Sequence, residues 1–439
     1  MSTSPTLTAG VARATITPPV GIDMSGFAGR EPSLGIHDEL YATALVFEEG
    51  EERVALVTCD LLFLEAEFVG QVREEAQRRT SLPAERVGIS CSHTHYGPAL
   101  GLERMDPDVR AYLELLKFQL AGAIQEAAAN VVPVTMGVGW GACDIGINRR
   151  ERKPDGTIVL GNNPEGTVDR AVGVVRIDRA EGGPLAVIAN FACHCVSQSG
   201  RMRLLSADYP GPARALVEGA TSATGSTGAT FLFAQGAGAN TNPIRMEHSY
   251  EPARTLGTRF GCEVLRVWET VAPVETAGIR SARQSLELPA LTFASVEEGQ
   301  AAVADLTTQL ENARKNNAGK GSIHWLERRL ERSTKALESL TGGEPLPTVA
   351  SEVQVLRAGE ATFCLTPGEV FCEIGMEVRE RSPLPNTLFL AYSNGSIGYV
   401  PTPESYPEGG YEVSHACRVG PGAAGIIVEA SLAALRQCA

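Results

Sequence analysis

Short apolar runs alternate with longer segments of helical periodicity along the first part of the chain. Three runs of strand length lie before residue 100: Tyr41–Glu48, Arg53–Cys59 and Val87–Cys91. Between and after them, Glu65–Arg79 and Asp106–Val131 carry apolar residues at the three- and four-residue spacing of a helix. Alternation of strands and helices predicts an α/β fold in which mixed central β-sheet layers are flanked by helices.

The same plan continues to the C-terminus. Further strands are predicted at Leu7–Pro18, Val132–Trp140, Ala171–Asp178, Leu185–Phe191, Ala229–Ala234, Val353–Gly359, Ala361–Leu365 and Thr387–Tyr392. The run Leu185–Phe191 is almost continuously apolar, which is typical of a strand that is buried on both faces near the centre of a sheet. The polar segment Asp144–Arg150 follows the strand Val132–Trp140, the tyrosine-rich segment 398–412 is expected to be an ordered loop, and Gly425–Gln437 a closing helix.

One segment differs in composition from the rest. Residues 294–340 are rich in Ala, Glu, Gln, Arg and Lys, and their helical periodicity is interrupted at Asn316–Gly319. This pattern predicts a helical hairpin arm near 294–341. Because there is no internal repeat and no linker of the kind that separates domains, we expect residues 1–439 to form a single catalytic domain with this hairpin as an insertion.

The chemistry is expected where strands end. Val87–Cys91 leads into Ser92-His93-Thr94-His95-Tyr96-Gly97-Pro98, and in an extended His-x-His the two imidazoles lie on the same side of the chain. His194 follows the end of Leu185–Phe191. Glu369, in Thr366-Pro367-Gly368-Glu369, is expected to open a helix that runs to about residue 381. Two histidines and one glutamate, with a position left open for water, match a catalytic zinc site.

Charge and composition narrow the possible partners. The formal net charge of −14 argues against a protein that binds nucleic acid or an anionic membrane, because both favour a basic surface. Neither a secretory signal nor an apolar run of membrane-spanning length is visible. Ten irregularly spaced cysteines are then interpreted as reduced thiols of a cytoplasmic protein. We expect a small-molecule substrate and no membrane anchor, and the oligomeric state stays open.

Taken together, these motifs resemble the neutral/alkaline ceramidase family. The run from Ser92 to Pro98 is similar to that family's Thr-His-Thr-His-Ser-Gly-Pro signature. Weaker similarities follow in the family's order: Asn148-Arg149, His194 after Ala-Asn-Phe-Ala-Cys, Ser206-Ala207-Asp208, Pro367-Gly368-Glu369, Asn394–Tyr399 and Gly410-Tyr411-Glu412. The resemblance extends over essentially the whole chain and indicates a shorter member, without the C-terminal β-sandwich of ceramidases.

The resemblance implies a residue set. Zinc (Zn²⁺) is expected to be held by His93, His194, Glu369 and Tyr399, with Tyr406 as an alternative to Tyr399. The positions that contact substrate or stabilise the oxyanion are matched by His95, Arg149 and Tyr411.

One departure from the family pattern concerns the nucleophile. Ceramidases carry Gly-Asp-Val-Ser-Pro where this chain has Ala239-Asn240-Thr241-Asn242-Pro243, so Asn242 replaces the serine. An amide is not a nucleophile, but it can orient water or substrate, and water activated by zinc would then have to attack. The general base stays unassigned, with Asp60 and Asp208 as candidates.

The sequence therefore predicts a zinc-dependent amidohydrolase that cleaves an N-acyl bond of a small or acyl-bearing substrate. Three alternatives stay open. The same zinc site could hydrolyse esters or lactones, because these reactions pass through the same kind of tetrahedral intermediate. A zinc-dependent binding protein without turnover is the second alternative, and Asn242 is the residue that favours it. In the third, the polar residues only pack and no metal binds.

Overall fold

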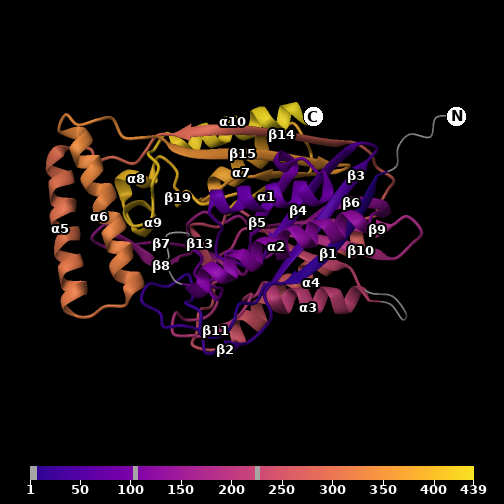
Figure 1. Cartoon of the computed structure of the whole chain (residues 1–439), viewed down its shortest axis with the longest axis horizontal. Coiled ribbons are helices and arrows are strands. Elements are labelled where there is room, and N and C mark those ends of the chain that lie inside the picture. The colour runs from indigo at the N-terminus through magenta and orange to yellow at the C-terminus, as the bar shows by residue number, and fades with distance from the viewer. Residues whose placement is uncertain (1–6, 102–106, 223–227) are drawn as a thin grey trace.

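The computed structural model describes residues 7–101, 107–222 and 228–439, and its largest sheet has eight strands in the order β12-β10-β9-β6-β1-β3-β4-β5 (Figure 1). Their bounds are β1 (Thr8–Thr15), β3 (Tyr41–Glu49), β4 (Glu52–Cys59), β5 (Val87–Cys91), β6 (Val132–Ala142), β9 (Ala171–Arg179), β10 (Pro184–Phe191) and β12 (Thr230–Gln235). The strand predicted at Leu185–Phe191 is an interior strand, but it lies next to the edge strand β12 rather than at the centre.

The eight strands form two halves. β1 and β6 pair at only two positions, Thr8 with Pro133 and Ala9 with Val132, whereas β1 and β3 pair over eight positions. Apolar side chains of both halves, such as Leu56 on β4 and Ile188 on β10, belong to one buried cluster. The two halves are therefore joined at one corner and pack against each other through a shared core.

A second sheet of four strands borders this core, in the order β14-β15-β16-β18. Its strands are β14 (Ile279–Leu288), β15 (Val349–Ala358), β16 (Ala361–Leu365) and β18 (Thr387–Leu390). Leu356 and Phe363 join the same buried cluster as the first sheet. β14 was not predicted, because charged residues such as Arg280 and Arg283 alternate with its buried residues and lower its apolar content.

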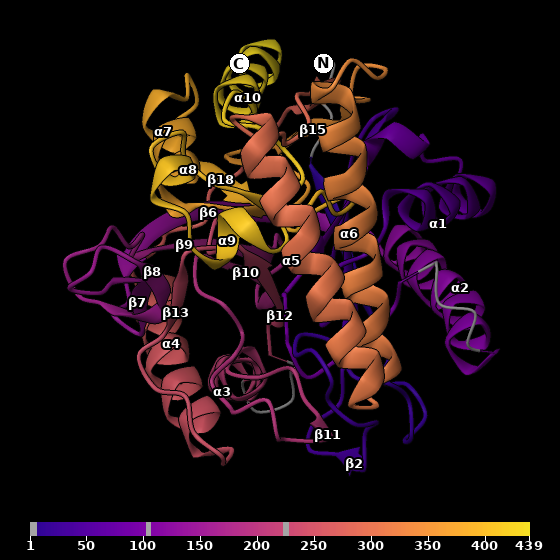
Figure 2. The ribbon, with the colours of Figure 1, turned by 90° about the vertical axis from the view of Figure 1, so that its left-hand side faces the viewer.

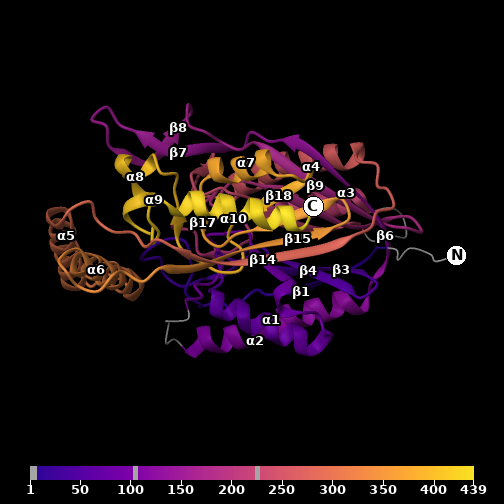
Figure 3. The same ribbon diagram turned by 90° about the horizontal axis from the view of Figure 1, so that it is seen from above.

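Helices cover the outer faces of the sheets (Figure 3). α1 (Ala66–Thr80) and α2 (Pro107–Ala129) pack on one half of the large sheet, α3 (Pro210–Thr221) and α4 (Glu251–Thr270) on the other, and α7 (Cys372–Arg381) and α10 (Ala423–Gln437) on the four-stranded sheet. The predicted α/β class with flanking helices is confirmed. The predicted start of α2 at Asp106 lies outside the described residues. Within the described chain, no helix has the length and apolarity needed to cross a bilayer.

The predicted helical arm is also confirmed. α5 (Val296–Lys315) and α6 (Lys320–Leu340) form an antiparallel pair with a small apolar core of their own, which contains Leu306, Leu310 and Leu326. Ser295 caps α5 by accepting a hydrogen bond from the backbone N–H of Glu298. Figures 1 and 2 show the arm standing across one end of the sheets, in front of the region where the short elements gather.

Those short elements correct several predictions. They are β2 (Gly35–Ile36), β7 (Gly146–Arg152), β8 (Ile158–Asn163), β11 (Leu204–Leu205), β13 (Thr241–Pro243), β17 (Glu369–Val370), β19 (Tyr399–Val400), η1 (Ala84–Arg86), α8 (Ser405–Glu408) and α9 (Tyr411–Ser414). The polar segment 144–150, to which the sequence assigned no element, is largely strand β7, and the tyrosine-rich segment, predicted to be a loop, contains β19, α8 and α9. These elements are too short or too polar to show a periodic pattern in the sequence.

Glu369 does not open a helix, as the sequence suggested. It begins the two-residue strand β17, and α7 starts three residues later at Cys372. The backbone N–H of Glu369 donates to the carbonyl oxygen of Gly398 at 2.9 Å, so pairing with β19 replaces the first helical turn. Gly368, with φ +89°, makes the bend that places the strand there.

A buried ion pair ties the helices of the first sheet to the second sheet. Arg73 on α1 lies 2.9 Å from Glu352 on β15, with 6% and 10% of the two side chains exposed. Arg73 also donates to the carbonyl oxygen of Val87 on β5, and Arg283 on β14 reaches the same carboxylate. Burial raises the pKa of Glu352, but the guanidinium groups of Arg73 and Arg283 lower it by more, so the net shift is downward.

We expect Glu352→Gln to lower the free energy of unfolding by about 3 kcal/mol, because Arg73 then stays buried without its counter-charge. Urea denaturation at pH 7 measures the loss. The exposed pair Glu377–Arg381 offers a control, and Glu377→Gln should leave the midpoint unchanged.

Since the pKa of Glu352 is lowered by folding, the stabilisation from this carboxylate is complete above about pH 4.3 and disappears as the pH falls through the lowered pKa. A difference between wild type and variant that widens in acid would contradict this assignment.

Candidate metal centre

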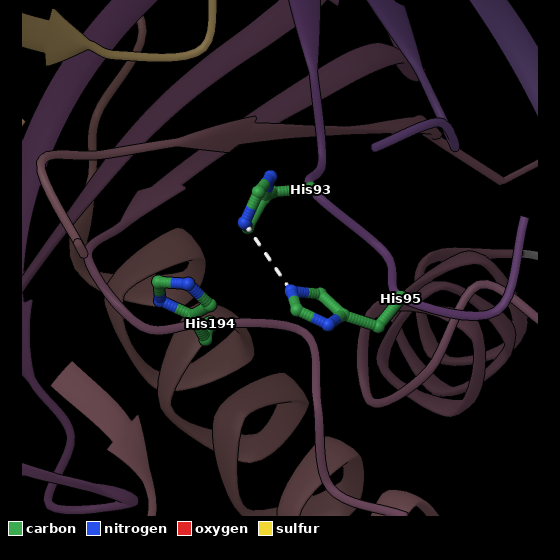
Figure 4. A group of neighbouring side chains, drawn as sticks. All are labelled: His93, His95 and His194. Carbon is green, nitrogen blue, oxygen red and sulfur yellow. Dashed lines mark hydrogen bonds between the residues drawn. The ribbon is translucent and has the colours of Figure 1, made fainter. Parts of the chain in front are cut away.

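Three histidines from two strand exits face one another. The loop after β5 and the loop after β10 form a parallel bridge between Thr94 and Cys195, and the N–H of His95 donates to the carbonyl oxygen of Cys195 at 3.1 Å. His93 and His95 flank Thr94, and His194 precedes its bridge partner Cys195, so the bridge brings the three histidines together. The backbone of His93 has a φ of 61°, so the loop turns at this residue. Figure 4 shows the three imidazoles directed toward a common centre, as the His-x-His pattern predicted.

Backbone carbonyls fix how the imidazoles present their nitrogens. One ring nitrogen from each of the three histidines lies within 4.8 Å of the others. Nδ1 of His93 lies 2.9 Å from the carbonyl oxygen of Leu62, and Nδ1 of His194 lies 2.7 Å from that of Gly238. A carbonyl only accepts, so each Nδ1 carries the proton and each Nε2 presents a lone pair to the centre.

Glu369 completes this set of acceptors. Its Oε2 lies 3.2 Å from Nε2 of His93 and 3.4 Å from Nε2 of His194. Among the described residues, no group donates a hydrogen bond to this buried oxygen. Two imidazole lone pairs and a carboxylate aimed at one point repel one another unless a cation lies between them, and they are ligands that zinc prefers. The residues present therefore fit a bound metal ion.

The pairing of β17 with β19 brings a tyrosine to the same place. Glu369 and Tyr399 are register partners in this parallel pair. Of the two tyrosines that the sequence offered as a fourth ligand, Tyr399 lies beside the cluster, whereas the hydroxyl of Tyr406 donates to the carbonyl oxygen of Val419. The ring of Tyr411 lies 5.9 Å from that of Tyr399, in an edge-to-face arrangement.

Arg149 on β7 connects the remaining residues. Its Nη1 lies 3.0 Å from Nε2 of His194 and donates to Oδ1 of Asn242 at 3.3 Å. Its Nη2 donates to the hydroxyl of Tyr399 at 2.9 Å, and its Nε donates to Glu412 at 2.7 Å. The four expected ligands and the four expected substrate-contacting residues therefore lie in one connected cluster, while their roles stay predictions.

Burial sets the charges within the cluster. Burial, followed by the charge of Arg149, lowers the pKa of His194 to about 4, and burial also lowers the pKa of His95. Burial raises the pKa of Glu369, but the imidazoles lower it by more. Burial raises the pKa of Tyr399 well above its ordinary value. At neutral pH the centre therefore presents uncharged imidazoles of His95 and His194, a carboxylate and a protonated phenol.

Two members of the cluster were missed by the sequence. The ring of Tyr392 stacks on His93 with centroids 4.2 Å apart, and its hydroxyl is buried without a hydrogen-bond partner in the described chain. Glu412 is 1% exposed and pairs with both Arg149 and Arg150. The sequence offered only weak signals for them. Tyr392 is the last residue of a predicted strand, and Glu412 is the last residue of the Gly410-Tyr411-Glu412 run that resembles the family.

The two aspartates considered as general bases are held in other networks. Asp60 is paired with Arg214 at 2.5 Å. Asp208 accepts hydrogen bonds from Ser197 and from the backbone N–H of Tyr209. Burial raises the pKa of Asp208 to about 7, although these hydrogen bonds act in the opposite direction. Both residues stabilise loops, and neither contacts the histidines through these bonds.

Comparison with known proteins identifies the family. The model of the neutral/alkaline non-lysosomal ceramidase N-terminal region matches residues 7–244, more than half of the chain. The chain belongs to the neutral/alkaline non-lysosomal ceramidase family. Neutral ceramidase A of Dictyostelium discoideum is 30% identical over 205 residues, which are 42% of this chain and 28% of that protein. Neutral ceramidase of Oryza sativa subsp. japonica is 29% identical over 267 residues, which are 56% of this chain and 32% of that protein.

A solved ceramidase shares the fold. The neutral ceramidase from Pseudomonas aeruginosa superposes with a TM-score of 0.75 at 19% identity, covering 99% of this chain and 75% of that one. At this sequence identity, the superposition shows that the two chains share a fold. The matches to the curated ceramidases span about a third of the length of those proteins.

We expect His194→Ala to abolish metal binding while the fold survives, because it removes one lone pair from the convergent set. Mass spectrometry of the purified protein should find about one zinc per chain in the wild type and close to none in the variant. His248→Ala removes an exposed histidine and serves as the matched control. Zinc retained at full stoichiometry in a folded His194→Ala protein would exclude His194 as a ligand.

Proposed function

We propose that this chain is a zinc-dependent hydrolase that cleaves the amide bond of an N-acyl substrate. The observation that carries the proposal is the convergence of Nε2 of His93, Nε2 of His194 and the carboxylate of Glu369 on one buried point. Membership of the ceramidase family supports the choice of an amide bond, since the named relatives are ceramidases.

In this proposal His93, His194 and Glu369 hold the metal, with Tyr399 as the fourth ligand. A zinc ion so held would polarise the substrate carbonyl and lower the pKa of its water toward about 7. The carbonyls of Leu62 and Gly238 keep the ligand nitrogens free of protons.

Arg149 is the group that best fits stabilisation of the developing oxyanion. Its Nε donates to Glu412, and its Nη1, which also lies 3.0 Å from Nε2 of His194, donates to Asn242. It also lies over the rings of Tyr399 and Tyr411, at 5.4 Å and 6.0 Å from the two centroids. A charge that is fixed in place before the reaction loses little by reorganisation, and such preorganised groups are usually the largest catalytic contribution. Tyr411 and His95 would orient the substrate beside it.

The pocket beside these residues sets the scale of the substrate. A cavity of about 200 Å³ is lined by His93, Glu369 and Tyr392 from the candidate centre, and by further residues of the helical arm. That volume is below the roughly 300–1,000 Å³ of most ligand pockets, so a small acyl compound fits it better than a bulky one. Whether ceramide itself is accepted is part of the test.

The proposal is tested by removing the metal. The purified protein is assayed against N-acyl amides, ceramide among them, and against esters and lactones of matched acyl length. We expect amide hydrolysis that a chelator abolishes and zinc restores. Undiminished activity in zinc-free protein would overturn the metal's role. Turnover of esters or lactones alone would show that the enzyme hydrolyses esters or lactones instead of amides. Zinc bound without any hydrolysis would favour a binding protein.

Asn242→Ala is expected to lower kcat/KM about tenfold, because Arg149 loses one of the acceptors that orient it. Zinc content should not change, since Asn242 is outside the ligand set. Asn162→Ala on strand β8 removes an exposed amide and is the matched control. Unchanged kinetics in Asn242→Ala would mean that this amide has only a structural role.

A further inference from the structure

The pocket of the candidate centre extends to the helical arm. Besides His93 and Glu369, its lining includes Trp325 and Arg332 of α6, and Arg418 from the segment after α9. Figure 2 shows α5 and α6 on the side of the molecule that faces the viewer, with α8 and α9 beside α5. A molecule that reaches the histidines from this side therefore passes the two arginines.

These two arginines are unusual among the cations of this acidic chain. The guanidinium groups of Arg332 and Arg418 make no hydrogen bond or ion pair with any described residue, whereas those of many other arginines, such as Arg73 and Arg149, are paired. Arg332 is half-buried, and its pKa is lowered to about 10. Burial is the largest cause, and the positive charges of Arg418 and two further arginines act in the same direction. A partly desolvated, unpaired guanidinium is costly unless an anion binds to it.

The described carboxylate whose charge acts on Arg332 does not supply that anion. Glu331 is the acid whose charge acts on Arg332, and it is bonded to Arg328 and Lys335. Arg332 and Arg418 consequently form a positive pair at the wall of a pocket whose other end holds the candidate zinc ligands.

Phe63, Trp325 and Tyr392 line the pocket between the arginines and the centre with aromatic rings, and a stack of further rings supports Trp325 from outside the lining. Trp325 stacks on His415 with centroids 5.9 Å apart, and His415 stacks on Tyr411 at 5.0 Å. Tyr411 in turn contacts Tyr399 at the centre. Such a wall suits the apolar carbons of a substrate that spans both ends of the pocket.

We propose that Arg332 and Arg418 form a subsite for a carboxylate or phosphate carried by the substrate, while the scissile amide of the same molecule lies at His93 and Glu369. This inference rests on the proposed hydrolase function and specifies its substrate class: N-acyl compounds with an anionic group a few bonds from the amide, rather than uncharged lipids. Arginine suits this role because its fork of donors binds both oxygens of a carboxylate or phosphate.

The test compares ligands that differ only in charge. Calorimetry measures binding of N-hexanoylglycine and of its uncharged primary amide, and of glutaric acid monomethylamide and its bis-methylamide, so that the anion is placed on either side of the scissile bond. In the wild type, the charged member of at least one pair should bind about tenfold or more tightly. The double variant Arg332→Gln/Arg418→Gln should lose that preference. Arg314→Gln, an exposed arginine of α5 paired with Glu327, should keep it.

Hydrolysis of the same four compounds separates this inference from the proposed function. Equal binding of charged and uncharged members in the wild type, or a preference that survives in the double variant, overturns the subsite even if all four compounds are hydrolysed. Charge-selective binding that is lost in the double variant, without hydrolysis of any compound, supports the subsite and overturns the hydrolase. The double variant should also lower kcat/KM for the charged member while leaving that for the uncharged member unchanged.

Discussion

The candidate centre depends on one short piece of backbone, residues 392–394. On one side this segment pairs with β5: the N–H of Cys91 donates to Tyr392 and that of Asn394 donates to Ile89. On the other side the N–H of Tyr392 donates to Gly368, at the base of the loop that carries Glu369. The histidine loop belongs to the large sheet, and Glu369 follows the second sheet. This shared segment therefore gives the two halves of the ligand set a common support, which the bond from the N–H of Ala239 to Val370 reinforces.

The segment is held in a backbone conformation that side chains seldom adopt. Among the described non-glycine residues, Tyr392, Asn394 and His93 have φ of 54°, 59° and 61°. Such backbone strain persists where surrounding bonds determine it, and it gathers at sites that need exact placement of groups. The side chain of Asn394 supplies some of those bonds, because it accepts from the N–H of Ile89 and donates to Gln354 of the second sheet. Strain and cross-linking therefore occur together beside the centre.

How far the sequence predicted this molecule can be judged from individual residues. The His-x-His motif follows a strongly apolar strand, so periodicity alone placed both imidazoles on one face. His194 was also found at a strand exit, and the family resemblance supplied Arg149 and Tyr399. Glu369 was named but put at a helix start, because pairing between two-residue strands is decided by partners distant in sequence. Tyr392 and Glu412 carry no motif of their own, and only the folded chain shows that they contact His93 and Arg149.

The connection of the arm has a consequence for how this protein can change. β14 and β15 are antiparallel neighbours paired along their whole length, from Ile279 with Ala358 to Leu288 with Val349. The arm is thus the extended tip of a hairpin, and it contributes nothing to the sheets beneath. Its sequence and length can vary without disturbing the scaffold of the metal ligands. In terms of the proposed subsite, Arg332 lies on this variable arm whereas Arg418 belongs to the part of the chain that follows the candidate ligands, so the arm could alter the preference for substrate only together with that fixed wall.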